Sequence, residues 1–172
     1  MKKILLSICI VGLAVVTFAQ KPVPQPEWTD FAKNMAAGKQ EKITMVYVYN
    51  TPCENCMVFE DEIFPDSTVI KALKNDFIAT RFFAATKDDI EYKGTNYSYS
   101  SFSDDEGVHI LAVLLLNGRM GYPSLVFLDK NNDVLNVHYA PQTSREVLTI
   151  LDYYSSGDYE KTEFDEWIKD KK

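Results

Sequence analysis

Cys53 and Cys56 are the residues of this chain whose type and spacing point most directly to chemistry. They enclose Glu54 and Asn55 and follow the apolar run Ile43–Tyr49, which is where a strand turns into a helix. At this spacing both thiols lie in the first helical turn, and the unsatisfied N–H groups of the helix end favour a thiolate on the first. Such a thiolate attacks a disulfide, and the second thiol resolves the mixed disulfide. The spacing therefore predicts a dithiol redox site.

The N-terminus has the pattern of a secretory signal peptide. A basic start precedes an apolar stretch at 4–18, which is shorter than the roughly 20 residues of a membrane-spanning helix. Small residues at the end of this stretch predict cleavage after Ala19, and so a signal peptide at 1–19. We expect an exported protein, periplasmic or secreted, with no stable membrane insertion after cleavage. An uncleaved N-terminal anchor is the alternative.

Cleavage of the signal peptide reduces the number of cysteines from three to two. Cys9 is removed with it, which leaves Cys53 and Cys56 as the only cysteines. A disulfide between residues three apart closes almost no loop and so adds little stability. Small exported domains that depend on disulfides carry more cysteines, farther apart. The pair is therefore present for redox chemistry or for metal binding.

The mature chain has the size of one domain. About 153 residues remain after cleavage, enough for a buried core. They carry 16 basic and 25 acidic residues, a net charge of −9, with no basic patch interleaved with aromatic residues. Nucleic acid is therefore not an expected partner. We expect a proline-rich linker at 20–26 and one domain at 27–172.

Hydrophobic periodicity predicts an α/β protein in which helices cover both faces of a mixed β-sheet. Residues 86–105 are polar without a sustained period, so they predict an insertion, extending over about 86–118, with a hairpin around Lys93–Gly94. The predicted strands are 43–49, 77–84, 123–128 and 134–139. The predicted helices are 27–38, one from Cys53, 67–75, 107–116, 143–154 and a last one that holds Phe164 and Trp167.

This order of elements, with a dithiol after the first buried strand and Tyr122-Pro123-Ser124 opening a later one, resembles the thioredoxin fold. More closely, it resembles exported thioredoxin-like proteins of Bacteroidetes-type bacteria. The resemblance implies a three-layer sandwich, with Cys53 as nucleophile, Cys56 as resolving thiol and no cofactor beyond their redox-active disulfide. It also implies a cis bond before Pro123, which lies beside the dithiol and leaves the Tyr122 backbone free to pair with a bound peptide.

The sequence departs from thioredoxin around the dithiol. Pro52 stands where thioredoxin has tryptophan, and Glu54-Asn55 stand for its Gly-Pro. Tyr47 occupies the position of a buried aspartate, so the proton acceptor for the resolving thiol is unassigned. Arg81 aligns roughly with a lysine near the thioredoxin site, and we interpret it as a surface or structural cation. The candidate site comprises Cys53 and Cys56 with the site-shaping residues Pro52, Glu54, Asn55, Tyr122 and Pro123.

The resemblance favours an exported thiol-disulfide oxidoreductase. A carboxylate at Glu54 raises the pKa of a neighbouring thiol, which favours a reductase or isomerase over a strong oxidant. The expected partners are protein thiols and disulfides of the cell envelope, together with a membrane electron donor or acceptor.

Two other functions stay open. The thiols bind Cu(I) or zinc if His109 or His138 supplies a further ligand, although neither histidine has the spacing of a metal motif. A non-catalytic peptide-binding domain is the second alternative, supported by the aromatic residues of the insertion. The acidic run Glu60–Glu62 predicts only a solvated helix face.

Overall fold

The structure, a computed structural model, describes residues 23–103 and 106–171. The predicted signal peptide and the first residues of the predicted linker lie outside these ranges. None of the helices in the described ranges is long and apolar enough to cross a membrane. The strands are β1 Thr29–Asp30, β2 Ile43–Tyr49, β3 Phe77–Phe83, β4 Ile90–Tyr92, β5 Thr95–Tyr97, β6 Tyr99–Ser101, β7 Gly107–His109, β8 Ser124–Leu128 and β9 Val134–Tyr139. The helices are α1 Phe31–Ala36, α2 Glu54–Val58, the π-helix η1 Phe59–Ile63, α3 Ser67–Asp76, α4 Ile110–Leu115, α5 Ser144–Ser155, the 3₁₀-helix η2 Asp158–Glu160 and α6 Phe164–Trp167.

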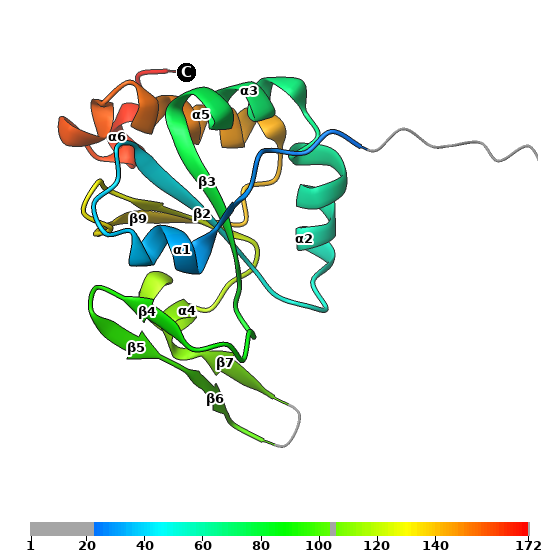
Figure 1. The fold of residues 1–172 in the computed structure, drawn as a ribbon. Helices are drawn as coiled ribbons and strands as arrows, with labels where there is room; N and C mark the ends of the chain where they lie inside the picture. The colour runs from blue at the N-terminus through cyan, green and yellow to red at the C-terminus, as the bar shows by residue number, and fades with distance from the viewer. Residues whose placement is uncertain (1–22, 104–105, 172) are drawn as a thin grey trace, which may run out of the picture.

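A mixed β-sheet of order β1-β3-β2-β8-β9 forms the centre of the molecule (Figure 1). Strand β3 runs parallel to β1 and β2, whereas β8 runs antiparallel to both β2 and β9. Val48 of β2 pairs with Ser124 of β8, so the last residues of β2 lie beside the first residues of β8. Both segments that carry predicted site residues therefore leave the sheet at the same end.

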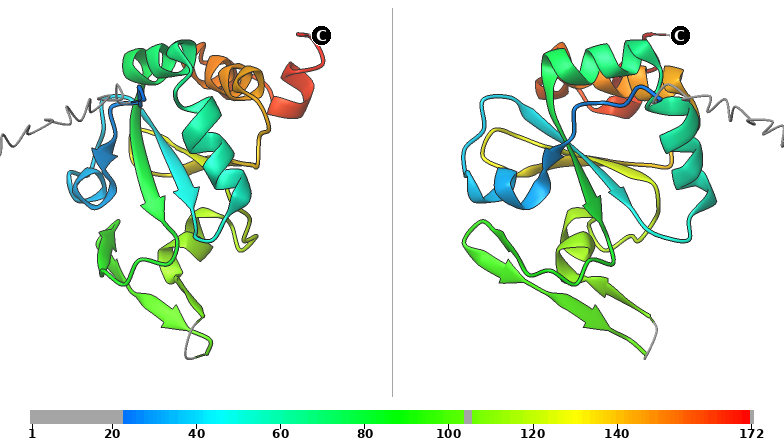
Figure 2. Two further views of the ribbon diagram at one scale, coloured as in Figure 1. Left: turned by 90° about the vertical axis from the view of Figure 1, so that its right-hand side faces the viewer. Right: turned by 45° about the vertical axis from the view of Figure 1, so that its right-hand side comes forward.

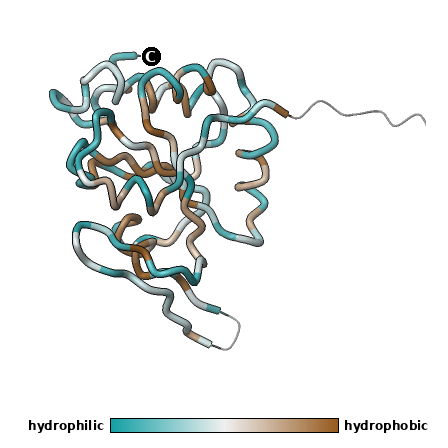
Figure 3. The backbone as a smooth tube through the Cα atoms, in the orientation of Figure 1, coloured by the Kyte–Doolittle hydropathy of each residue, from teal (hydrophilic) through white to brown (hydrophobic). Residues whose placement is uncertain are grey.

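Side chains of β2 alternate between the two faces of the sheet, as a period of two requires. Met45 and Tyr47 join one core cluster with η1, α3, α5 and α6, while Val46 and Val48 join a second with α1 and α4. Figure 2 shows these helices in two layers, one on each side of the strands. Figure 3 shows that the central strands are predominantly hydrophobic, in contrast to the β5–β6 region. The predicted three-layer α/β architecture is confirmed.

The N-terminal helix is shorter than the predicted 27–38. It begins at Phe31, because the Asp30 side chain accepts a hydrogen bond from the Lys33 N–H and caps the helix. Thr29 belongs to the sheet as part of β1, since it pairs with Thr80 of β3, and its hydroxyl also donates to Ala79 O at 2.8 Å. This pairing with β3 is remote in sequence, which is why local periodicity did not predict it.

The insertion contains two hairpins, β4–β5 beside α4 and β6–β7 below it (Figure 1), each a two-stranded sheet of its own. The predicted hairpin at Lys93–Gly94 is confirmed: it joins β4 and β5, and both turn residues have positive φ, 52° and 75°. The predicted helix at 107–116 was wrong at its start, because residues 107–109 form β7 against β6. At Gly107 any Cβ would collide with Tyr99 and the Ser100 carbonyl oxygen, so the close pairing of these strands requires glycine.

Candidate active site

The dithiol segment leaves the sheet at the end of β2 and starts a helix at once. Cys53 is the N-cap of α2, and its Sγ accepts a hydrogen bond from the Cys56 N–H at 3.1 Å. The sulfur thus replaces the hydroxyl or carboxylate that usually satisfies a free N–H at this position. The peptide bond between Thr51 and Pro52 in the preceding turn is cis, a feature that the sequence did not lead us to expect.

Cys53 and Cys56 are joined by a disulfide, with their Cα atoms 5.2 Å apart. Cys53 is partly exposed, whereas Cys56 is only 4% exposed. The intervening Glu54 and Asn55 are both exposed. An attacking thiol must be reachable by a protein disulfide and a resolving thiol need not be. The roles of Cys53 and Cys56 stay a prediction, for which this order of exposure is the relevant observation.

The predicted proline lies at the adjoining strand. The Tyr122–Pro123 peptide bond is cis. The pairing of Val48 with Ser124 places Pro123 opposite the C-terminal end of β2, from which the dithiol turn continues. Pro123 is buried and has no N–H to donate, while Tyr122 is half-buried. The backbone beside the thiols therefore offers acceptors but no donor from Pro123.

Tyr47 lies beneath the dithiol helix. Its ring is fully buried and stacks on Phe59 at 5.8 Å, and its hydroxyl donates to Cys56 O at 3.3 Å. Burial, with a smaller contribution from the Glu60 carboxylate, raises the pKa of Tyr47 well above its ordinary value. The phenol stays neutral and acts as a donor, so it does not replace a carboxylate as proton acceptor.

Arg81 of β3 stands opposite Tyr47 in the sheet and continues this cluster. Its guanidinium pairs with the Glu60 carboxylate and lies 5.0 Å from the ring centre of Tyr49 and 5.4 Å from that of Trp28. The interpretation of Arg81 as a structural cation agrees with these contacts, since Glu60 and three aromatic rings hold it.

The sequence did not lead us to predict the ion pair between Glu60 and Arg81. Asp61 and Glu62 are exposed, as predicted for a solvated helix face, but Glu60 is half-buried against Arg81. Its position four residues after Cys56 was the available signal, because residues at that spacing share a helix face. That signal was masked by the two neighbouring acids.

Both histidines form hydrogen bonds within the protein. His109 is fully buried; its Nδ1 accepts from the Leu111 N–H at 3.2 Å and its Nε2 lies 3.1 Å from Asp88 O. His138 Nε2 lies 3.0 Å from the Tyr154 hydroxyl. Within residues 23–103 and 106–171, no three metal-ligating side chains cluster together.

Known structures share the fold of this chain, although the comparisons by sequence find no match. No protein-family model matches the chain, and no curated protein matches it. A thioredoxin-fold protein from Helicobacter pylori superposes with a TM-score of 0.58 at 14% identity, over 78% of this chain and 81% of that one. A thioredoxin from Thermus thermophilus superposes with a TM-score of 0.54 at 15% identity, over 82% of this chain and 99% of that one.

A putative disulphide-isomerase from Bacteroides thetaiotaomicron gives a TM-score of 0.53 at 14% identity, covering 83% of this chain and 99% of its own. This chain has the thioredoxin fold. In this thioredoxin fold, a Cys-x-x-Cys disulfide caps the helix after the central strand, and a cis-proline opens the neighbouring strand. At such low identity the likeness concerns the fold, and the chemistry must be argued from the site itself.

Proposed function

We propose that the protein is an exported thiol-disulfide oxidoreductase that cycles Cys53 and Cys56 between disulfide and dithiol. The observation that carries this proposal is the asymmetry of the pair: a partly exposed Cys53 at a helix N-terminus, backed by a buried Cys56. In the reduced form, the Cys53 thiolate attacks one sulfur of a substrate disulfide and the other sulfur leaves as a thiolate. Cys56 then attacks the mixed disulfide, which releases the reduced substrate and restores the Cys53–Cys56 bond.

Pro123 and Tyr122 have a supporting role in this proposal. The cis-proline removes a backbone donor beside the thiols, and the Tyr122 backbone pairs with the substrate peptide near the reacting sulfur. Pro52, Glu54 and Asn55 shape the exposed rim of the same turn. We propose a reductase or isomerase direction, because the exposed Glu54 carboxylate disfavours a neighbouring thiolate. A reduction potential near −120 mV, the value of a strong oxidant, would contradict this direction.

A trap experiment tests the activity. The Cys56→Ser variant keeps the nucleophile and lacks the resolving thiol, so mixed disulfides with envelope proteins should accumulate in the native host. The Cys53→Ser variant is the matched control and should trap none. If the wild type fails to reduce insulin disulfides and Cys56→Ser traps no partner, the proposal fails.

Export is proposed from the N-terminal pattern, and a membrane donor or acceptor follows from it, since the cytosolic electron supply is then out of reach. Fractionation of the host, with sequencing of the mature N-terminus, should find the protein outside the cytosol and starting at Gln20. An N-terminus that retains the apolar stretch would contradict signal cleavage.

A further inference from the structure

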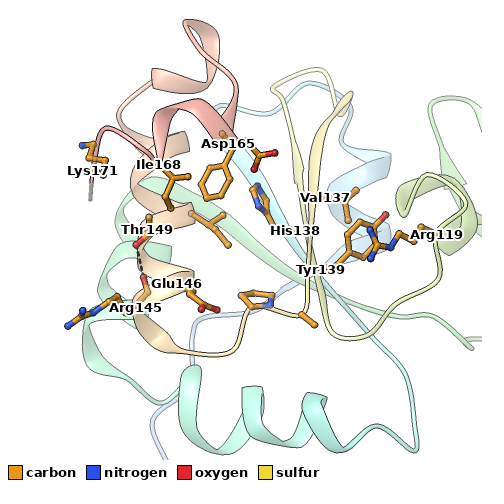
Figure 4. A pocket seen from close by; sticks show the side chains of 14 residues that line it. Arg119, Val137, His138, Tyr139, Arg145, Glu146, Thr149, Asp165, Ile168 and Lys171 are labelled. Carbon is orange, nitrogen blue, oxygen red and sulfur yellow. Dashed lines mark hydrogen bonds between the residues drawn. The ribbon is translucent and has the colours of Figure 1, made fainter.

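A groove of about 910 Å³ follows strand β9, and none of its lining residues belongs to the helix that carries the thiols. Figure 4 shows it between β9 on one side and α5 and α6 on the other, with His138 and Ile168 between these elements and Arg145 at the outer side of α5. Strand β9 is the last strand of the sheet, and in the described ranges no strand pairs with its outer edge. An edge of this kind presents free backbone donors and acceptors to an added strand.

The groove gathers positive charge on an acidic protein. The net charge of the chain is −7, yet two of its three arginines, Arg119 and Arg145, line this groove. Both are exposed, and no ion pair joins either of them to an acid of the described residues. The third, Arg81, is already paired with Glu60. Arginine binds carboxylates through a planar pair of donors, so the two arginines here suit an acidic ligand.

The two acids that line the groove, Glu146 and Asp165, form no ion pair with these arginines. The Glu146 carboxylate accepts the Gln142 N–H at 2.5 Å and so belongs to the cap of α5. Lys171 lies 3.6 Å from the Asp152 carboxylate. Arg119 stands over the Tyr139 ring at 4.5 Å, which orients the guanidinium without neutralising it.

Apolar side chains complete the lining. Val137 comes from β9, Ile150 from α5, and Phe164 and Ile168 from the last helical segment. An apolar lining between cationic borders fits an extended polypeptide that carries both acidic and apolar side chains. Because successive side chains of a strand face opposite ways, two adjacent acidic residues present one carboxylate to each face, one toward Arg119 and one toward Arg145. Figure 4 places Arg119 beyond Tyr139 on one side of β9 and Arg145 on α5 on the other.

One end of the groove adjoins the site of disulfide exchange. Tyr139 pairs with Ser124, and the Ala140 N–H donates to Pro123 O at 2.8 Å. Ala140 and Pro141 line the groove, so its lining is hydrogen-bonded directly to the cis-proline. A chain that places its cysteine at Cys53 and passes Pro123 can therefore continue along β9.

We propose that this groove docks an extended acidic segment of the disulfide substrate, which pairs with the free edge of β9 and places carboxylates on Arg119 and Arg145. The proposal rests on the proposed function, since it names the substrate class of the same site. Docking changes no bond; it raises the local concentration of the substrate disulfide beside Cys53.

Binding of a cysteine-free peptide tests the groove independently of redox chemistry. The probe is a fluorescein-labelled peptide of about ten residues in which pairs of aspartates alternate with pairs of valines, so that both of its faces carry carboxylates. It is long enough to span the six-residue strand β9. Fluorescence anisotropy with the full oxidised chain should show roughly tenfold weaker binding when asparagine replaces aspartate, and when Arg119→Gln and Arg145→Gln are combined. The control variant Lys39→Gln, an exposed cation outside the groove, should bind as the wild type does.

Equal binding of the two peptides, or full affinity in the double arginine variant, would overturn the proposal. So would a dimer in sedimentation experiments that the double arginine variant dissociates, because the occupant would then be a second copy of the chain. Urea denaturation of the double variant should match that of Lys39→Gln, which ensures that lost binding is not lost folding.

A second readout separates this proposal from the proposed function. The reduced chain is mixed with two peptides that carry an internal disulfide, one flanked by aspartates and one by asparagines. Faster reduction of the aspartate peptide, lost in the double arginine variant, supports both ideas. Equal reduction of the two peptides without arginine-dependent binding overturns the groove and leaves the activity. Arginine-dependent binding with no reduction of either peptide retains the groove as an acidic-peptide site and overturns the activity.

Discussion

Two helices in this protein are capped at their N-termini by an unusual side chain, and the two caps differ in what they can do. The Cys53 sulfur caps α2 by accepting the Cys56 N–H, and the His109 ring caps α4 by accepting the Leu111 N–H. Backbone hydrogen bonds link the end of β2, four residues before Cys53, to His109: the Ala84 N–H donates to Tyr49 O and the His109 N–H donates to Ala84 O, each at 2.8 Å.

Exposure is what separates the two caps. Cys53 is partly open to solvent, while His109 has 0% exposure and packs edge-on against Phe82. A polarised helix end activates a nucleophile only where a second molecule reaches it; where it is buried, the same hydrogen bond contributes stability alone. The comparison therefore predicts that the Cys53 cap is needed for disulfide exchange but not for stability. The His109 cap should be needed for stability but not for exchange.

The largest expected effect is the loss of exchange in Cys53→Ser. Serine caps a helix at least as well as cysteine, and a disulfide that closes so short a loop adds little stability. The free energy of unfolding, measured by urea denaturation, should therefore change by less than about 1 kcal/mol. Insulin-disulfide reduction should fall by more than about a hundredfold, because the nucleophilic thiolate is gone. Residual exchange close to that of the wild type would show that Cys53 is not the nucleophile.

The matching change at the buried cap is His109→Ala, which should cost about 2 to 3 kcal/mol in the free energy of unfolding. The variant loses the α4 cap and leaves the Asp88 carbonyl oxygen without its ring partner. The measurement is urea denaturation, with His109→Asn as the control that restores a capping side chain and part of the loss. Exchange per folded molecule should stay within a few-fold of the wild type, and a loss as large as that of Cys53→Ser would refute the comparison.

A pH dependence follows from the second histidine. Burial lowers the pKa of His138 to about 4, against an opposing effect of Asp165, and its Nε2 meets the Tyr154 hydroxyl. Because the unfolded chain binds this proton more readily, the stabilisation is complete above the ordinary histidine pKa near 6.5 and is lost as pH falls toward 4.

The loss attributable to His138 over this window should be about 2 kcal/mol. Urea denaturation at pH 7 and at pH 4.5 should therefore show a smaller drop in His138→Gln than in the wild type. Identical drops in the two proteins would mean that His138 titrates normally in the folded state.

The smallest expected effect concerns the residue beneath the exposed cap. Tyr47→Phe removes the hydroxyl that donates to Cys56 O but keeps the stacked ring. It should cost about 1 kcal/mol or less in stability and change insulin reduction by only a few-fold, since a neutral phenol takes no proton from Cys56. A hundredfold fall in reduction, with stability unchanged, would instead make Tyr47 part of the proton path.

Local sequence pattern predicted much of the fold because the informative signals were short-range. The apolar run of β2, the Cys-x-x-Cys turn and the Lys93–Gly94 hairpin each depend on neighbouring residues, and the structure contains all three. The strand β1 and the hairpin β6–β7 were missed. Their residues become strands only through pairing partners or a close approach at Gly107 that no local period reveals.

The amino-acid sequence by itself indicated the pair of thiols that the structure joins in a disulfide at the start of a helix, because their spacing and the preceding apolar run are local signals. It also sufficed to indicate which proline accompanies them. Burial and distant contacts required the folded chain: the order of exposure of Cys53 and Cys56, the pairing of Glu60 with Arg81, and the groove beside β9. These features join elements far apart in the chain, and only packing brings their charges and surfaces together.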